Sequence, residues 1–163
     1  MAILSFLSNL QFLWFLIGAT TTAILFLSFI YKKEQRLFNN LKRPVAIIVS
    51  DEDSMSQEDE LLRRVQFFNI HLLRDTRRSI DLINSHYRLV ILRYQKGSEN
   101  FWSTFNSLSG KQIPVIVFSK PGEIDSSDIK KIQEYSLYTL CNTPLRLISD
   151  VFAIMSTYQE DKI

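Results

Sequence analysis

The distribution of apolar and charged residues divides the chain into two parts. None of the first 31 residues carries a charge, and Phe12 to Tyr31 form an apolar run of 20 residues. An α-helix rises about 1.5 Å per residue, so this run is long enough to cross a hydrocarbon layer of roughly 30 Å. The pattern predicts a single transmembrane helix. A cleaved signal peptide is the alternative, but a basic leading region and a small-residue cleavage site are missing from the sequence.

A second pattern begins at Pro44, where short apolar runs alternate with segments of helical periodicity. The apolar runs predict five strands, over 45–49, 70–73, 89–92, 115–118 and 138–141. The segments between and after them predict helices over about 57–68, around 80–83, over 101–108, near 127–135 and from 144 onward. Short, wholly apolar strands that alternate with helices are typical of a parallel sheet covered on both faces. We therefore expect a doubly wound α/β domain, in which function concentrates at the carboxyl ends of the strands.

Three helix ends carry recognisable signals. Ser56 and Asp59 have the spacing of a capping box, in which each side chain bonds to the main-chain N–H of the other residue. Gly110 follows the apolar face of the third helix and is expected to form its C-terminal cap. Pro144 suits the first turn of the last helix, because the N–H groups there have no partner within a helix.

Charge predicts the orientation of the membrane helix. The residues that follow it include Lys32, Lys33, Arg36, Lys42 and Arg43, against Glu34 alone. Because positively charged flanks stay on the cytoplasmic side, we expect the amino terminus outside the inner membrane and the rest in the cytoplasm. The basic segment 32–43 either continues the helix or lies on anionic lipid headgroups. The expected organisation is a membrane segment over 1–31, a basic linker over 32–43 and a cytoplasmic domain over 44–163.

Small residues recur on one face of the predicted membrane helix. Gly18 and Thr22, and likewise Ala19 and Ala23, lie four positions apart. Small side chains at this spacing let two helices approach closely, although such residues are common in membrane helices in general. The spacing predicts a homo-oligomer that associates through this face.

Composition excludes several kinds of chemistry. All 19 Lys and Arg and all 17 Asp and Glu lie beyond residue 31, and the net charge is only +2, so the basic footprint of a DNA- or RNA-binding protein is missing. The lone Cys141 and two histidines make a zinc site improbable. The four glycines are scattered and form no phosphate-binding loop. We therefore predict neither a metal nor a cofactor.

The strand ends resemble those of response-regulator receiver domains, in order, from residue 45 to about residue 157. The matching segments are AIIVSDED, YRLVILRYQ, PVIVFS and CNTPLRL. The resemblance implies a five-stranded, flavodoxin-like parallel sheet of strand order 2-1-3-4-5 and a role in signalling. It also implies a site built from an acidic pair, a phosphoacceptor aspartate, a hydroxyl and a lysine. The residues at or beside those positions are Ser50, Asp51, Glu52, Asp53, Arg93, Ser119 and Thr143.

Two of these positions depart from the receiver pattern. Arg93 stands where receivers carry the phosphoacceptor aspartate, and a guanidinium can neither attack phosphorus nor ligate Mg²⁺. Thr143 stands where receivers have a lysine before the proline. We expect Arg93 to pair with an acidic residue of segment 51–53 in place of a metal. The resemblance thus describes a receiver that is not phosphorylated in the usual way, and that binds a cytoplasmic protein partner instead of acting as an enzyme.

Two alternatives stay open. Segment 102–108 faintly resembles the third helix of Toll/interleukin-receptor-like domains, but Asn106 falls where the NAD-cleaving members have a catalytic glutamate, which disfavours that activity. The second alternative is a membrane effector gated by a nucleotide messenger, such as a cyclic oligonucleotide in phage defence. Its phosphate contacts would be Arg63, Arg64, Arg74, Arg77, Arg78 and Lys120. Exposed charges of this kind are more often simply solvated.

Overall fold

The computed structural model describes residues 2–49, 55–73, 83 and 86–157. The chain divides into two compact units, Met1–Phe38 and Asn39–Ile163. The boundary between the units falls inside the basic segment 32–43, after the apolar run and before the first strand.

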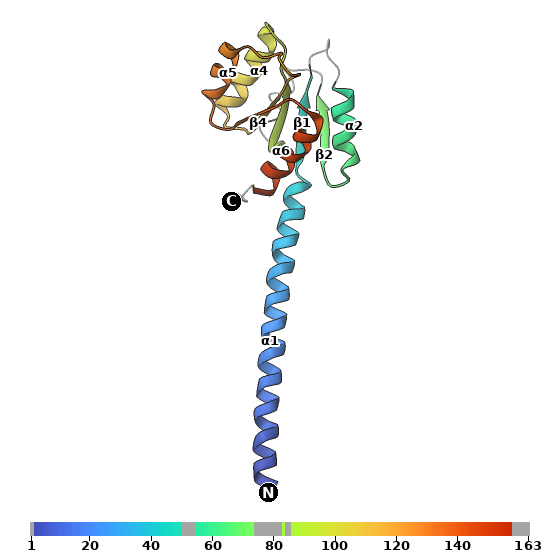
Figure 1. Ribbon diagram of the computed structural model, residues 1–163, viewed down its shortest axis with the longest axis vertical. Coiled ribbons are helices and arrows are strands. Elements are labelled where there is room, and N and C mark those ends of the chain that lie inside the picture. The colour runs from blue at the N-terminus through green and yellow to red at the C-terminus, as the bar shows by residue number, and fades with distance from the viewer. Residues whose placement is uncertain (1, 50–54, 74–82, 84–85, 158–163) are drawn as a thin grey trace. The chain divides into compact units, whose positions relative to one another are not determined.

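Helix α1 (Ala2–Leu41) makes up the first unit and extends unbroken into the basic segment (Figure 1). Of the two alternatives for the basic segment, helical continuation is the one observed. Within α1, Phe12–Leu41 has a window of mean hydropathy 2.0 that is wholly exposed, and it is the one described helix long and apolar enough to cross a membrane. Length and composition allow this helix to span a membrane, as they would allow a signal sequence.

Three consecutive threonines near the middle of α1 satisfy their hydroxyl groups within the helix. Thr20, Thr21 and Thr22 each donate to the carbonyl oxygen four residues earlier, at 2.9, 2.7 and 2.8 Å. The predicted packing face is open, since a Cβ added at Gly18 would meet nothing within 4 Å, and Ala19 and Ala23 are exposed. The described residues therefore leave this face accessible, and its self-association stays a prediction.

A five-stranded parallel sheet forms the centre of the second unit, with strand order β2-β1-β3-β4-β5. The strands are β1 (Pro44–Ile48), β2 (Asn69–Leu73), β3 (Leu89–Arg93), β4 (Val115–Phe118) and β5 (Tyr138–Cys141). In the centre of the sheet, Ile91 of β3 lies between Ile47 of β1 and Ile116 of β4. This topology confirms the predicted doubly wound α/β fold.

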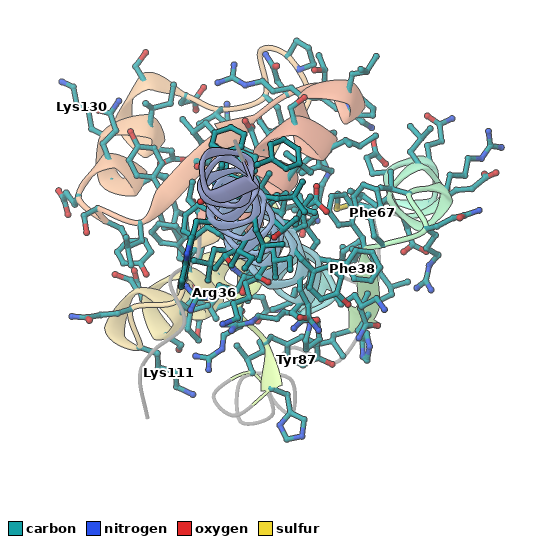
Figure 2. The ribbon with its side chains drawn as sticks, turned by 90° about the horizontal axis from the view of Figure 1, so that it is seen from below. Arg36, Phe38, Phe67, Tyr87, Lys111 and Lys130 are labelled. Carbon is teal, nitrogen blue, oxygen red and sulfur yellow. The ribbon has the colours of Figure 1, made fainter. Side chains whose placement is uncertain are left out.

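Helices cover both faces of the sheet, as the wholly apolar strands require. On one face Leu62 of α2 (Ser56–Arg64) and Val151 of α6 (Pro144–Thr157) are buried in one core cluster. On the other face Phe105 of α4 (Glu99–Gly110) and Ile132 of α5 (Ser126–Gln133) are buried in a second cluster. Figure 1 shows α4 and α5 together on that side. Lys130 on α5 is exposed and points outward (Figure 2).

The predicted capping signals of two helices are wrong. Helix α2 has Met55 at its N-cap with no side-chain hydrogen bond, and Ser56 is already helical. The carboxylate of Asp59 instead accepts from Nε of Arg63 at 2.8 and 2.9 Å, so it does not form the predicted capping box. Helix α4 includes Gly110 as its last residue, and its C-cap is Lys111.

Two helix predictions also differ in extent. Helix α2 ends at Arg64, four residues earlier than expected, because Val65 is extended and the chain then turns to bury Phe68 just before β2. The helix expected around 80–83 lies outside the described residues, apart from the buried Ile83.

Candidate functional site

Arg93 ends the central strand β3, and its side chain is buried at the carboxyl edge of the sheet. The strand positions it there because Leu89, Ile91 and Arg93 alternate onto one face, and the first two of them lie in the core cluster of that face. The side chain of Arg93 is only 4% exposed. A buried guanidinium must find acceptors, since burying an unpaired charge is costly.

One partner of Arg93 is Glu123, in the loop that follows β4. Nη1 and Nη2 of Arg93 donate to the two carboxylate oxygens of Glu123 at 2.8 and 3.2 Å. Nη1 also donates to the carbonyl oxygen of Phe118 at 3.2 Å, and the guanidinium carbon lies 5.7 Å from the centre of the Phe118 ring. Glu123 further accepts from the main-chain N–H of Lys120 at 2.7 Å. A bidentate, charge-assisted pair of this kind fixes both orientation and distance.

Two more contacts join the end of β3 to the residues that follow β4. The buried hydroxyl of Tyr94 donates to Oδ2 of Asp128 at 2.6 Å, and Nζ of Lys96 lies 2.9 Å from Oδ2 of Asp125. Burial raises the pKa of the Tyr94 hydroxyl well above its ordinary value, and the hydrogen bond to Asp128 raises this pKa further. The hydrogen bond to Asp125 raises the pKa of Lys96. These contacts and the Arg93–Glu123 pair together form what we call the β3 clamp.

The β3 clamp holds the segment after β4 from both faces of the sheet. Arg93 lies on the face covered by α2 and α6, whereas the next residue, Tyr94, belongs to the core cluster of the opposite face. Successive residues of a strand point to opposite faces, so two neighbouring side chains can grip one segment from two sides. Residues 123–128, which lead into α5, are therefore tied to the end of β3 at three points.

Ser119 and Thr143 occupy the strand ends where receivers carry a hydroxyl and a lysine. Ser119 is buried just past β4, and its N–H donates to the carbonyl oxygen of Cys141 at 2.9 Å. Oγ1 of Thr143 accepts from the N–H of Arg146 at 3.4 Å, so Thr143 caps α6. Burial raises the pKa of the Cys141 thiol, which donates to the carbonyl oxygen of Thr143 at 3.2 Å.

The acidic segment expected to face Arg93 cannot be compared with this arrangement. Residues 50–53 lie outside the described residues, so their pairing with Arg93 stays a prediction. Among the described residues, no group of three or more His, Cys, Asp or Glu side chains is placed to hold a metal ion.

The candidate phosphate-binding arginines of α2 already have acidic partners. Arg63 pairs with Asp59 at 2.8 Å, and Arg64 pairs with Glu60 at 2.7 Å, each pair one turn apart on the exposed side of the helix. Arg74, Arg77 and Arg78 lie outside the described residues. The proximity of the five arginines therefore stays a prediction, whereas Lys120 lies in the loop next to Glu123.

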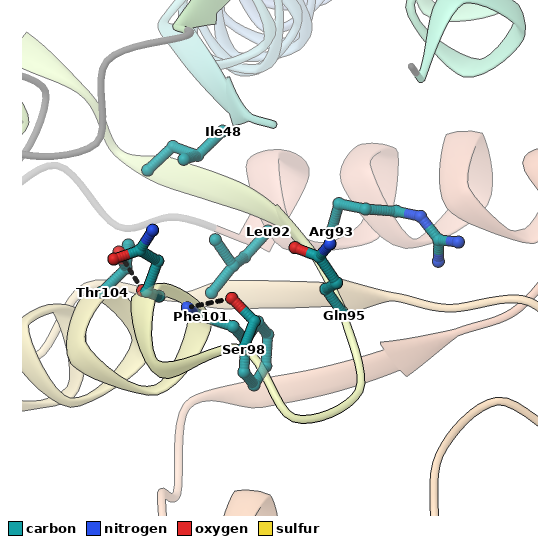
Figure 3. A pocket seen from close by; sticks show the side chains of 8 residues that line it. Ile48, Leu92, Arg93, Gln95, Ser98, Phe101 and Thr104 are labelled. Atoms are coloured by element: carbon teal, nitrogen blue, oxygen red, sulfur yellow. Dashed lines mark hydrogen bonds between the residues drawn. The ribbon is translucent and has the colours of Figure 1, made fainter. Parts of the chain in front are cut away.

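A small cavity lies beside the end of β3, on the side facing α4 (Figure 3). Its volume is about 20 Å³, which has room for about one water molecule. Two of its polar side chains are already bonded, since Oγ of Ser98 accepts from the N–H of Phe101 and Oγ1 of Thr104 donates to the carbonyl oxygen of Asn100. The guanidinium of Arg93 points away from the others in Figure 3. This cavity is too small to be a substrate site.

The second unit is similar to response-regulator receiver domains. The receiver domain of a Francisella response regulator matches with a TM-score of 0.55 and 14% identity, over 69% of this chain and 96% of that one. A two-component response regulator from Clostridium difficile matches with a TM-score of 0.54 and 19% identity, over 71% of this chain and 97% of that one. These matches define the class of fold, which is receiver-like.

Other comparisons limit what this likeness means. A lysine decarboxylase from Francisella novicida contains the same fold in 18% of its chain, with a TM-score of 0.51 and 8% identity over 71% of this chain. No protein-family model matches the sequence, and no curated protein matches it. At such low identities the likeness shows the fold alone, and the site must be argued from its own residues.

Sequence reasoning singled out Arg93 but missed the three acidic residues that complete the β3 clamp. Glu123, Asp125 and Asp128 lie just after the fourth strand and at the start of the next helix, where acidic residues also occur to complement a helix N-terminus. The available signal was their position, because the carboxyl ends of neighbouring parallel strands meet at one edge of the sheet.

Proposed function

We propose that this chain is a membrane-anchored signalling protein whose receiver-like domain binds a cytoplasmic protein partner without catalysing a reaction. The observation that carries the proposal is the buried Arg93–Glu123 pair at the end of β3. The resemblance to receiver domains places their phosphoacceptor aspartate at the position of Arg93. A guanidinium has no nucleophilic oxygen, so an acyl phosphate cannot form there.

The β3 clamp supports the proposal because it would keep the loop after β4 in one arrangement. A receiver that switches needs this loop to take two arrangements, with a ligand or a modification favouring one of them. Here a permanent internal cation binds Glu123 of that loop through two hydrogen bonds. We infer a degenerate receiver that presents a constant surface to its partner, and whose signalling depends on location and assembly.

Helix α1 would supply both location and assembly. Its length and composition suit a single membrane span, and the basic residues at 32, 33, 36, 42 and 43 favour a cytoplasmic second unit at the inner membrane, with the amino terminus outside. Self-association through Gly18 and Ala19 would bring several receiver-like domains together and raise their effective concentration for a weakly binding partner.

The phosphorylation part of the proposal is tested on the full chain in detergent micelles. The protein is incubated with Mg²⁺ and acetyl phosphate, and bound phosphoryl groups are measured by intact-mass spectrometry, with a receiver that keeps its aspartate treated in parallel. We expect no phosphoryl adduct on this chain. A stable aspartyl phosphate on Asp51 or Asp53 would contradict the proposal.

The partner is sought by cross-linking in membranes and affinity purification of the tagged full chain. A chain limited to residues 1–43 serves as the matched control, because it keeps the membrane segment and the basic residues. We expect a cytoplasmic protein to be recovered only with the full chain. Recovery of the same proteins with both chains would count against partner binding by the receiver-like domain, and thermal stabilisation by a nucleotide would favour the messenger-gated alternative.

A further inference from the structure

The second unit has a depression that the proposed function does not use. It has a volume of about 270 Å³, is open to solvent and lies at the carboxyl ends of β4 and β5, between the loop after β4 and the start of α6. Its polar lining includes Ser119, Lys120, Asn142 and Arg146, and its apolar lining includes Ile124 and Leu140. In open α/β sheets this edge is the usual place for ligands.

The lining of the depression carries positive charge without a carboxylate. Lys120 and Arg146 are its charged residues, and no aspartate or glutamate lines it. No ion pair joins Nζ of Lys120 to any of the described residues. Arg146 forms an ion pair with Asp150 on the next turn of α6, but the distance from Nε to Oδ2 is 3.6 Å, too long for a hydrogen bond.

A carboxylate of the adjoining loop is already engaged. Glu123 lies between two lining residues, Gly122 and Ile124, yet both of its oxygens accept from Arg93 and one also accepts from the N–H of Lys120. Its charge is therefore largely matched by the buried guanidinium. The side-chain charges of Lys120 and Arg146 stay at the surface, where both residues are exposed.

We propose that this depression binds a small organic anion, with its oxyanion at Lys120 and Arg146 and its compact apolar part against Ile124 and Leu140. Lysine and arginine donors with an adjacent amide and hydroxyl suit a phosphate or a carboxylate. The volume is just below the usual 300–1,000 Å³ of small-molecule sites. One anionic head with a ring-sized body fits these dimensions, whereas a whole cyclic oligonucleotide does not.

Such a ligand would contact the loop that the β3 clamp holds. Residues 119–122 line the depression and directly precede Glu123. The bound anion would thus add a chemical input to a domain that lacks the usual phosphoacceptor. This site goes beyond the proposed partner binding and does not depend on it.

The test is an NMR titration of the ¹⁵N-labelled full chain in detergent micelles. The probes are phenyl phosphate, benzoate and neutral benzyl alcohol, and the readout is the amide shifts of Gly122 and Asn142 in the depression. We expect saturable shifts with at least one of the two anions and none with the alcohol. The anion that binds more tightly identifies the head group as phosphate or carboxylate.

Charge variants make the assignment specific. Lys120→Gln combined with Arg146→Gln should weaken binding of the preferred anion at least tenfold, because both side chains would supply the charge-assisted bonds. Lys130→Gln is the matched control, since this lysine of α5 is exposed and does not line the depression. The proposal is overturned if neither anion gives saturable shifts, if benzyl alcohol binds as tightly, or if the combined variant binds like Lys130→Gln.

Discussion

Removing the carboxylate of Glu123 should destabilise the receiver-like domain more than removing its buried partner Arg93. In Glu123→Ala, Arg93 loses two charge-assisted hydrogen bonds, and its side chain is only 4% exposed in the unaltered protein. In Arg93→Met, Glu123 keeps the N–H of Lys120 and is 25% exposed, so water can solvate the remaining charge. Because Arg93 is more deeply buried than Glu123, Glu123→Ala should lower the free energy of unfolding more than Arg93→Met does.

The magnitude follows from the burial of the charge that is left behind. Breaking a fully buried ion pair costs about 3–5 kcal/mol, and we expect about 3 kcal/mol for Glu123→Ala because the carbonyl oxygen of Phe118 still accepts from Arg93. For Arg93→Met we expect the free energy of unfolding to fall by about 1 kcal/mol, because the charge that remains, on Glu123, can be solvated by water. The double variant should cost less than the sum of the two, as expected for side chains in direct contact.

The assay is urea unfolding of the full chain in detergent, followed by tryptophan fluorescence. The sequence has two tryptophans, so a Trp14→Phe background leaves Trp102 in α4 as the reporter of the receiver-like domain. Glu134→Ala, at the exposed C-cap of α5, is the control and should change the free energy of unfolding by less than about 0.5 kcal/mol. Equal costs for both single variants, or a loss below about 1 kcal/mol for Glu123→Ala, would refute the reasoning, because the charge of Arg93 would then be balanced elsewhere.

Two further predictions concern the hydroxyl of Tyr94 and the small-residue face of α1. Because burial and the bond to Asp128 raise the pKa of Tyr94 in the folded state, its contribution to stability is fully present below about pH 10 and is lost as the pH rises further. Tyr94→Phe should reduce that alkaline loss in urea titrations at pH 9 to 11, and an unchanged pH profile would exclude the hydroxyl of Tyr94 as its source. Gly18→Leu with Ala19→Leu should abolish oligomers detected by cross-linking in micelles, whereas Thr20→Leu on another face should not; equal assembly of all three proteins would show that α1 is only a tether.

The sheet could be predicted from the sequence because each strand carries its own signal. Runs such as 89–92 and 115–118 are wholly apolar, and the helices between them have apolar faces at helical spacing, so local pattern and global fold agree. The predicted capping box was wrong because its signal, a local spacing, is compatible with more than one bonding partner. The spacing of Ser56 and Asp59 fits a capping box, but Asp59 binds Arg63 one turn further on. A local pattern cannot decide between two partners that are both within reach.

The β3 clamp could not be predicted because its partners are far apart in the sequence. Arg93 and Glu123 are separated by 30 positions, and the pairing depends on how the loop after β4 crosses the end of the neighbouring strand. The sequence marked Arg93 as unusual and predicted an acidic partner, since a buried guanidinium needs one. Several carboxylates follow nearby strands, however, and only the three-dimensional arrangement shows that Glu123 is one that binds it.

The three threonines of α1 that bond within their own helix bear on two separate steps, entry into a bilayer and association of copies. In hydrocarbon, an unsatisfied hydroxyl would favour a second helix that offers an acceptor. Thr20, Thr21 and Thr22 already donate to carbonyl oxygens of their own helix, so a single copy can enter a bilayer without waiting for another. If copies associate as we propose, their pairing would be a separate equilibrium that depends on the number of molecules in the membrane.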